Sequence, residues 1–289
     1  MNILTFDIED WYNCDFLSGN FDWDHYEVRI YQGVERILEE LEKRGLKGTF
    51  FCLGWIAEHH PDVIRAIHRQ GHHIGCHSYQ HELAFRMDEK SFKADTLKAK
   101  RLIEEVIGEE VNAFRAPGFS ITRHNTWALR SLAEMGFRYD CSMFPAPHDY
   151  GGMPSYGDGI PKRIDVGDGL WVKEFPINVH TLWGKHLVFS GGGFFRLFPY
   201  GLIDRWAKEC DYMMTYFHPR DFDTGQPVIK TLPLKRRFKS YVGIKGAFAK
   251  FRRLLDNYEF CNVEEADGRI DWAKAPVLKL EELNKEQRI

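Results

Sequence analysis

The sequence predicts an α/β protein in which strands and helices alternate around a parallel sheet or barrel. In the first half of the chain, short apolar runs that fit strands alternate with segments whose apolar residues recur at helical spacing. Of the 289 residues, 44% are hydrophobic and 28% are charged, and the formal net charge is −3. A chain of this length can bury about three quarters of the surface that its unfolded form exposes. This composition excludes disorder, collagen-like repeats and a small disulfide-stapled scaffold.

We expect five strand–helix units, followed by later strands that close the fold. The first strand ends at Asp7, and the helix after it stops at Gly45, as a helix does before a glycine. Further strands are expected over residues 49–54, 73–76, 113–115, 137–141, 171–175 and 212–217. Helices are expected around residues 34–41, 61–67, 97–107, 124–135 and 202–210.

Two stretches break this pattern. Residues 144–169 are rich in Pro, Gly, Tyr and Asp, which predicts an irregular insertion near the mouth of the site. We expect residues 1–225 to form the barrel and residues 226–289 to form a basic extension that packs on it. Between residues 224 and 255 there are nine Lys and Arg and no Asp or Glu. This basic face is either solvated, or it docks through residues 230–255 on an anionic membrane or on the pyrophosphate of a linked sugar.

Composition also bounds the partners and the compartment. No window approaches the roughly 18 apolar residues of a membrane-spanning helix. Met1 leads directly into a strand, so we expect no signal peptide. The six cysteines are scattered and form no CxxC pair, which indicates reduced thiols. We therefore expect a cytoplasmic protein, in contact at most with the inner face of the membrane, and its acidity argues against nucleic acid as a partner.

Five polar side chains fall at, or just after, the carboxyl ends of predicted strands. They are Asp7, His77, Arg115, Asp140 and His218. In a parallel barrel, this is the face on which active sites are built. We therefore expect these residues to meet at one site.

The spacing of the histidines predicts a metal centre on the same face. The chain has three His-x-x-x-His pairs, and two are excluded because one straddles a helix end and the other lies along a strand, about 13 Å from end to end. His77 and His81 begin where a strand ends, and a helical turn there would place both imidazoles on one face. Two imidazoles with a carboxylate and open positions are typical of a catalytic divalent site. The run Asp7-Ile8-Glu9-Asp10 offers carboxylates, although such a turn alone can equally be a helix cap or a solvated loop.

These segments resemble the successive motifs of the polysaccharide deacetylase (NodB homology) family, carbohydrate esterase family 4, over roughly residues 1–225. In the order of the family, the motifs are Thr5-Phe6-Asp7-Ile8-Glu9-Asp10, Thr49-Phe50-Phe51-Cys52-Leu53-Gly54, His77-Ser78-Tyr79-Gln80-His81, Arg115-Ala116-Pro117-Gly118 and Phe217-His218-Pro219. Residues 191–196 and 217–223 look like a subgroup associated with exopolysaccharide and surface-glycan synthesis.

The resemblance implies a single-domain, distorted (β/α)7-type barrel with a C-terminal helical extension. It implies hydrolysis of the N-acetyl amide of an amino sugar, in a surface polysaccharide or its lipid- or nucleotide-linked precursor, with release of acetate. It also implies a divalent metal ion, zinc in the first place, with cobalt, nickel or iron as alternatives. His77 and His81 would be two of its ligands.

The roles of the family's other residues carry over to matching positions. Asp7 would act as the general base, and Arg115 would orient it through a charge-assisted hydrogen bond. His218 would protonate the leaving amine. An imidazolium needs a carboxylate partner, and we expect Asp140 to be that partner.

One position departs from the common family pattern, which has two adjacent aspartates where this chain has Asp7 and Ile8. The carboxylate ligand must therefore come from elsewhere. In an extended segment Glu9 points to the same side as Asp7, so Glu9 is the predicted ligand. A bulge would present Asp10 instead. The departure leaves room for a metal-independent, allantoinase-like amidohydrolase, and a catalytically silent glycan-binding barrel is the rival from another class.

Overall fold

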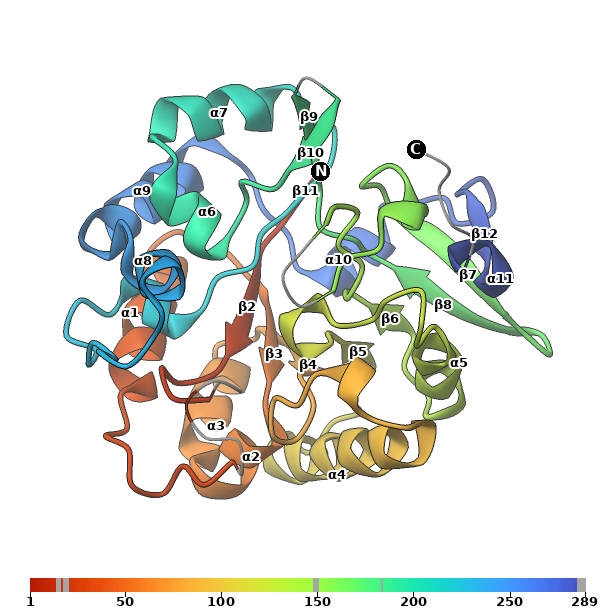
Figure 1. Cartoon of the computed structure of the whole chain (residues 1–289), viewed down its shortest axis with the longest axis horizontal. Coiled ribbons are helices and arrows are strands. Elements are labelled where there is room, and N and C mark those ends of the chain that lie inside the picture. Colours follow the sequence, from red (N-terminus) through yellow and green to blue (C-terminus); the bar gives the residue numbers. More distant parts are fainter. Residues whose placement is uncertain (14–16, 18–20, 148–150, 183, 285–289) are drawn as a thin grey trace.

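The computed structural model describes residues 1–13, 17, 21–147, 151–182 and 184–284 (Figure 1). Its main sheet has eight strands in the order β12-β7-β8-β6-β5-β4-β3-β2. These strands are β2 (Thr5–Ile8), β3 (Thr49–Cys52), β4 (His73–Cys76), β5 (Ala113–Phe114), β6 (Tyr139–Asp140), β7 (Lys162–Gly167), β8 (Leu170–Glu174) and β12 (Val277–Lys279). The smaller sheets pair β1 (Asn2–Ile3) with β11 (Met213–Met214), and β9 (His180–Leu182) with β10 (Lys185–Leu187).

Neighbouring strands run parallel from β2 through β3, β4, β5 and β6 to β8. The predicted α/β class with a mostly parallel sheet is therefore confirmed. Parallel strands need crossover connections, and helices supply them here.

The sheet curls toward a barrel that is closed unevenly. On one side, β1 runs on into β2 and pairs in parallel with β11, and Phe6 bridges to Phe217. On the other side, the segment after β8 meets β11 through side chains. The hydroxyl of Tyr212 donates to the carbonyl of Pro176 (2.8 Å), and the side-chain oxygen of Asn178 accepts from the amide of Met214 (3.1 Å). At this seam the two segments are joined by side-chain hydrogen bonds.

Helices lie around the outside of the strands (Figure 1). They are α1 (Ile30–Glu42), α2 (Gly54–His59), α3 (Pro61–Arg69), α4 (Glu89–Ile107), α5 (Trp127–Glu134), α6 (Gly192–Leu197), α7 (Tyr200–Lys208), α8 (Leu234–Tyr241), α9 (Ile244–Asn257), α10 (Val263–Asp267) and α11 (Leu280–Leu283). Short 3₁₀ turns are η1 (Ala84–Arg86), η2 (Pro117–Phe119), η3 (Pro154–Tyr156) and η4 (Pro219–Phe222). Within the described ranges, every helix is too short or too polar to cross a membrane.

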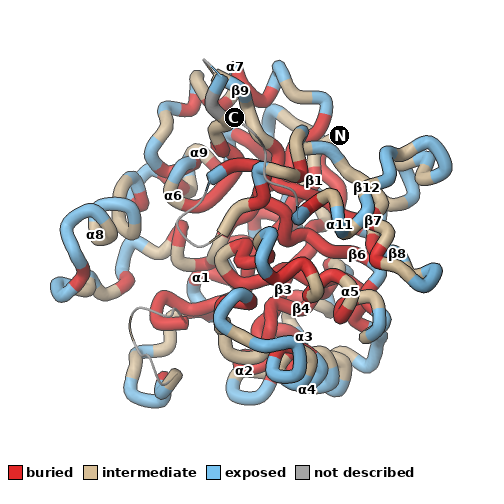
Figure 2. The backbone as a smooth tube through the Cα atoms, turned by 45° about the vertical axis from the view of Figure 1, so that its right-hand side comes forward, coloured by how far each residue is buried: buried red, intermediate tan, exposed pale blue. Residues whose placement is uncertain are grey.

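The core lies between the strands and the helices, where Figure 2 shows the buried backbone. Under the first strand it is aromatic: the ring centroids of Phe6 and Phe50 are 4.6 Å apart, and those of Phe217 and Phe251 are 5.2 Å apart. All four side chains are buried. This packing fixes β2 against residues 215–218, and those two segments carry the acidic residues and the histidine of the site.

The prediction that residues 144–169 are irregular is wrong for the second part of this segment. There β7 pairs antiparallel with β8, and its two buried apolar residues, Ile164 and Val166, alternate with more exposed ones. Charged residues around this short alternation hide it in the sequence. Residues 148–150 lie outside the described part of the chain.

The C-terminal residues do more than pack on the barrel. β12 pairs in parallel with β7, and Ile3 bridges to Cys261. The polypeptide beyond residue 225 therefore contributes to the sheet as well as covering it with helices.

Candidate metal centre and active site

The end of β2 brings two carboxylates to one place. The amide of Asp7 donates to the carbonyl of Phe217 (2.8 Å), and the amide of Glu9 donates back to the carbonyl of Asp7 (3.2 Å). Both side chains are buried. Asp7 Oδ2 and Glu9 Oε1 each lie 3.7 Å from His218 Nε2. The two acids thus face the same side, as an extended segment predicts.

A loop, residues 77–81, brings the two site histidines close together. The prediction of a helical turn there is wrong. Ser78 and His81 have φ values of +68° and +60°, in the left-handed region that residues other than glycine rarely adopt. The hydroxyl of Ser78 accepts from the amide of His81 (3.1 Å), and the carboxylate of Asp95 accepts from the amide of Tyr79 (2.9 Å). These contacts hold the turn, and the ring centroids of His77 and His81 are 5.3 Å apart. Strained backbone of this kind is typical of functional sites.

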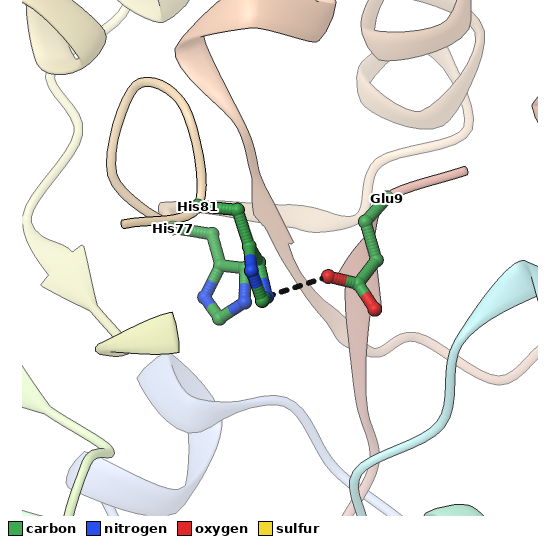
Figure 3. A group of neighbouring side chains, drawn as sticks. All are labelled: Glu9, His77 and His81. Carbon is green, nitrogen blue, oxygen red and sulfur yellow. Dashed lines mark ion pairs between the residues drawn. The ribbon is translucent and has the colours of Figure 1, made fainter. Parts of the chain in front are cut away.

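Glu9, His77 and His81 converge from β2 and from the loop after β4 (Figure 3). One ligand atom of each residue lies within 4.8 Å of those of the other two. Glu9 Oε2 is 2.7 Å from His81 Nε2. His77 Nδ1 donates to the carbonyl of Arg115 (2.7 Å), which leaves Nε2 as the atom with a lone pair. A second hydrogen bond of this kind is typical of histidines that bind metal. The three residues fit a divalent cation.

The protonation states suit the same ligand set. Burial raises the pKa of Glu9, but the contact with His81 and the charges of His218 and His77 lower it to about 2. Burial lowers the pKa of His77 to about 4. Glu9 is therefore ionised and His77 is neutral at pH 7. These are the forms that bind metal ions.

Asp10, the alternative ligand, is engaged elsewhere. Its Oδ2 accepts from the amides of Arg29 (2.6 Å) and Ile30 (2.8 Å), and its Oδ1 accepts from the amide of Trp11 (2.7 Å). These bonds satisfy donors at the start of α1, so Asp10 acts as a helix cap. The acidic turn is thus divided: Asp10 caps a helix, and Glu9 faces the histidines.

Arg115 binds the carboxylate oxygen of Asp7 that does not face His218. Its Nη1 donates to Asp7 Oδ1 (2.7 Å), and its Nε donates to the carbonyl of Cys141 (3.2 Å). The guanidinium carbon lies 4.3 Å from the ring centroid of Phe51, and the side chain is fully buried. A charge-assisted bond from so fixed a donor orients Asp7, whose Oδ2 then faces His218.

The carboxylate partner of His218 is Asp221, and the expectation of Asp140 is wrong. His218 Nδ1 lies 3.0 Å from Asp221 Oδ2, which also accepts from the amide of His218 (2.9 Å). Burial lowers the pKa of His218, but Asp221, followed by Glu9 and Asp7, raises it to about 9. The imidazole is therefore protonated at neutral pH. The signal in the sequence is an acid three residues after the histidine at a Pro turn, which is the spacing of a capping box.

Asp140 belongs to a different contact. Its Oδ1 accepts from the hydroxyl of Ser142 (2.5 Å), and it lies in register with Glu174 on the neighbouring strand β8. Burial raises the pKa of both carboxyls. The carboxyl end of β6 therefore carries a buried acid pair that the sequence did not reveal, because Glu174 reads as part of an ordinary strand.

Arg196, which sequence reasoning placed only in a subgroup motif, holds Asp221. Its Nε lies 3.0 Å from Asp221 Oδ1. Its other nitrogens donate to the carbonyls of Ser240 (2.8 Å) and Lys239 (3.0 Å) at the end of α8. Burial raises the pKa of Asp221, but Arg196 and then His218 lower it to about 2. Asp221 is thus an ionised acid between a guanidinium and an imidazolium.

The comparisons with known proteins agree with this geometry. Residues 4–139 match the family model described as "Polysaccharide deacetylase", and residues 141–267 match the one described as "Domain of unknown function (DUF3473)". A peptidoglycan deacetylase of Helicobacter pylori is 28% identical over 156 residues, which are 54% of this chain and 48% of that protein. The chain spans 34 to 62% of the length of the first curated relatives that it matches.

Two solved structures share the fold. A proposed polysaccharide deacetylase from Mycobacterium smegmatis aligns with a TM-score of 0.64 and 22% identity, over 95% of this chain and 91% of that one. The Puue allantoinase aligns with a TM-score of 0.57 and 19% identity, over 92% of this chain and 87% of that one. The fold is thus that of the deacetylase and allantoinase barrels. Over residues 4–139, which are less than half of the chain, the sequence is similar to the polysaccharide deacetylase family.

Proposed function

We propose that this protein is a metal-dependent hydrolase that removes the acetyl group from the nitrogen of an amino sugar and releases acetate. One observation carries the proposal. The ligand set of Glu9, His77 and His81 lies beside a base and an acid, since Asp7 Oδ2 and Glu9 Oε1 are both 3.7 Å from His218 Nε2. The match to the polysaccharide deacetylase model supports the reaction class.

The residues present divide the chemistry among themselves. A divalent cation held by Glu9, His77 and His81 would supply Lewis acidity toward the amide carbonyl and toward water. Asp7, oriented by Arg115, takes the proton from the attacking water.

His218 completes the hydrolysis. Its Nε2 faces the two acids, and its Nδ1 is paired with Asp221, so that the imidazolium gives a proton to the sugar nitrogen as the C–N bond breaks. The products are acetate and a free amine.

We further propose that the substrate is an N-acetylated saccharide of a surface polysaccharide, or its lipid- or nucleotide-linked precursor. The motif resemblance of residues 191–196 and 217–223 supports this choice. We propose zinc as the ion, because a His/His/carboxylate set suits it, with cobalt, nickel and iron as alternatives. The described cysteines are free thiols, which supports a cytoplasmic location.

Metal content and acetate release, measured together, test the proposed function. We expect about one equivalent of metal in protein purified without chelator. Acetate release from a panel of N-acetylhexosamine substrates should stop after chelation and return when metal is restored. Acetate release that persists after complete metal removal would indicate a metal-independent amidohydrolase instead.

A pair of variants separates metal binding from proton transfer. Asp7→Asn removes the base but no ligand, so metal content should stay at the wild-type level while turnover falls at least about 100-fold. His81→Ala should lose the metal and the activity together. Normal acetate release by Asp7→Asn would contradict the assigned roles.

A further inference from the structure

The surface around α8 exposes several large apolar side chains. The eight residues of α8 include no buried side chain. Leu234 is 75% exposed and Phe238 is 58% exposed, and residues four apart lie on the same side of a helix. We call these two residues, together with the exposed Phe194, Leu197 and Val228, the α6–α8 face.

The members of the α6–α8 face come from elements that are joined. The buried Arg196 on α6 donates to the carbonyls of Lys239 and Ser240 on α8. The hydroxyl of Tyr241 donates to the carbonyl of Pro227 (3.0 Å), next to Val228. In Figure 1, α8 lies beside α6, and in Figure 2 it projects from the edge of the molecule. Five of the eleven exposed large apolar side chains in the described part of the chain belong to this face. Clustering of this kind marks an interaction site.

Positive charge surrounds these apolar side chains. Residues 224–255 hold nine Lys and Arg and no acid, in a chain whose net charge is −3. Lys230, Lys235 and Lys245 are exposed; Lys235 follows Leu234 on α8, and Lys245 lies at the start of α9.

The structure also shows which part of the basic stretch, residues 224–255, could contact a partner. In α9 the apolar residues Ile244, Ala247, Phe251, Leu254 and Leu255 are buried. Two of its basic residues are used within the fold, since Lys250 donates to the carbonyl of Arg196 (2.7 Å) and Arg252 pairs with Glu40. Within residues 224–255, the exposed large apolar side chains are Val228, Leu234 and Phe238, which lie in α8 or just before it.

We propose that the α6–α8 face docks on the surface of a bilayer that contains anionic lipids. Apolar side chains that enter the headgroup region and cations that meet lipid phosphates are the two contributions that hold peripheral proteins on membranes. The absence of acids from residues 224–255 favours a dense anionic surface over a protein partner of mixed charge. The proposal does not depend on the enzymatic activity.

Vesicle co-sedimentation of the full chain tests the proposal. We expect binding to vesicles of phosphatidylcholine that contain one-third phosphatidylglycerol, weak binding to phosphatidylcholine alone, and a decrease with added salt. Leu234→Ser/Phe238→Ser should weaken binding at least about tenfold, because both apolar anchors are lost. Lys230→Glu/Lys235→Glu should remove the preference for the anionic lipid.

A matched control uses exposed apolar residues from elsewhere on the surface. Leu97 on α4 is 43% exposed and Val277 on β12 is 45% exposed, and both lie outside the α6–α8 face, so Leu97→Ser/Val277→Ser should bind like the wild type. Thermal unfolding of every variant shows that each one is folded.

Three outcomes would overturn the proposal: no binding to either vesicle, equal binding to both vesicles, or equal loss in the control variant. If the wild type binds no vesicle but self-associates, and Leu234→Ser/Phe238→Ser is monomeric, the face is an interface between copies of this chain.

Discussion

His218 is the residue in which the electrostatics of the site come together. It faces Asp7 and Glu9 on one side and Asp221 on the other, and it lies within 3.7 Å of all three carboxylates. Because the nearest of them, Asp221, is ionised, the imidazole keeps its proton at neutral pH. Asp221 thus keeps a proton on the imidazole although its own carboxylate carries none.

We predict that Asp221→Asn lowers kcat by about 100-fold and leaves the metal content unchanged, because an amide cannot stabilise the imidazolium. Steady-state kinetics and metal analysis measure both quantities. Asp140→Asn is the matched control, since it removes a buried carboxylate that does not contact His218. A larger loss of kcat in folded Asp140→Asn than in Asp221→Asn would contradict the pairing.

The two neighbouring acids Glu9 and Asp10 should differ in metal binding. We predict that Glu9→Gln weakens binding of a divalent ion at least about tenfold, because the amide oxygen is a weaker ligand than a carboxylate. Asp10→Asn should bind the ion like the wild type, because Asp10 faces backbone amides. Calorimetric titration of each variant with the ion measures the two affinities. Equal weakening in both variants would mean that the acidic turn acts as one unit.

At the scale of elements, Asp10 ties the site to the first helix. We predict that Asp10→Ala lowers the free energy of unfolding by about 1 kcal/mol, because the amides of Arg29 and Ile30 lose their acceptor. Urea unfolding measures the change. Asp88→Ala, which removes the exposed cap of α4, is the control and should cost less, since it frees one amide that water can reach.

The elements that the sequence predicts best are those whose signals are local. β4 spans His73–Cys76, as expected, and α4 ends at Ile107 before Gly108, whose φ is +75°. By contrast, β12 pairs with β7 across more than a hundred residues, and no local pattern specifies that contact. Local signals mark where elements end, but distant pairing decides which strands are added to the sheet.

The same division holds within the site. Asp7, Glu9, His77, His81, Arg115 and His218 could be found because each follows a recognisable strand or motif. The positive φ values of Ser78 and His81 could not, because a helical turn fits the same spacing. Asp221 was missed for another reason: position at a strand end, which favoured Asp140, says nothing about which way a side chain faces.

At the scale of the whole molecule, two regions share one site. Asp7, Glu9, His77 and Arg115 lie in the part that matches the polysaccharide deacetylase model, and His218 lies in the part that matches the domain of unknown function. β1 pairs with β11 and Phe6 bridges to Phe217, so the second region supplies its histidine from the segment that follows β11 along the first strands. Neither region holds the proposed base and acid alone.

The stability of the whole fold should fall in acid, in part through His72. This side chain is 4% exposed, and burial lowers its pKa to about 4. The unfolded chain binds this proton near pH 6.5, so the contribution is complete above pH 6.5 and is lost as the pH falls through about 4. The shift corresponds to roughly 3 kcal/mol.

Replacement of His72 separates its contribution to the pH dependence of the free energy of unfolding from the contributions of other buried histidines. We predict that the free energy of unfolding of His72→Gln falls less steeply than that of the wild type between pH 7 and pH 4.5. Urea midpoints at the two pH values give the comparison. Parallel falls in the two proteins would show that His72 titrates normally in the folded state.

Arg196 links the outer helix α8 to Asp221 in the site. Two nitrogens of its buried guanidinium donate to carbonyls at the end of α8, and the third, Nε, forms an ion pair with Asp221. Because the guanidinium is rigid and planar, it cannot follow a shift of α8 and still keep its place against Asp221. We therefore expect a displacement of this outer helix to change the position of Asp221 and, through it, that of the proposed proton donor His218.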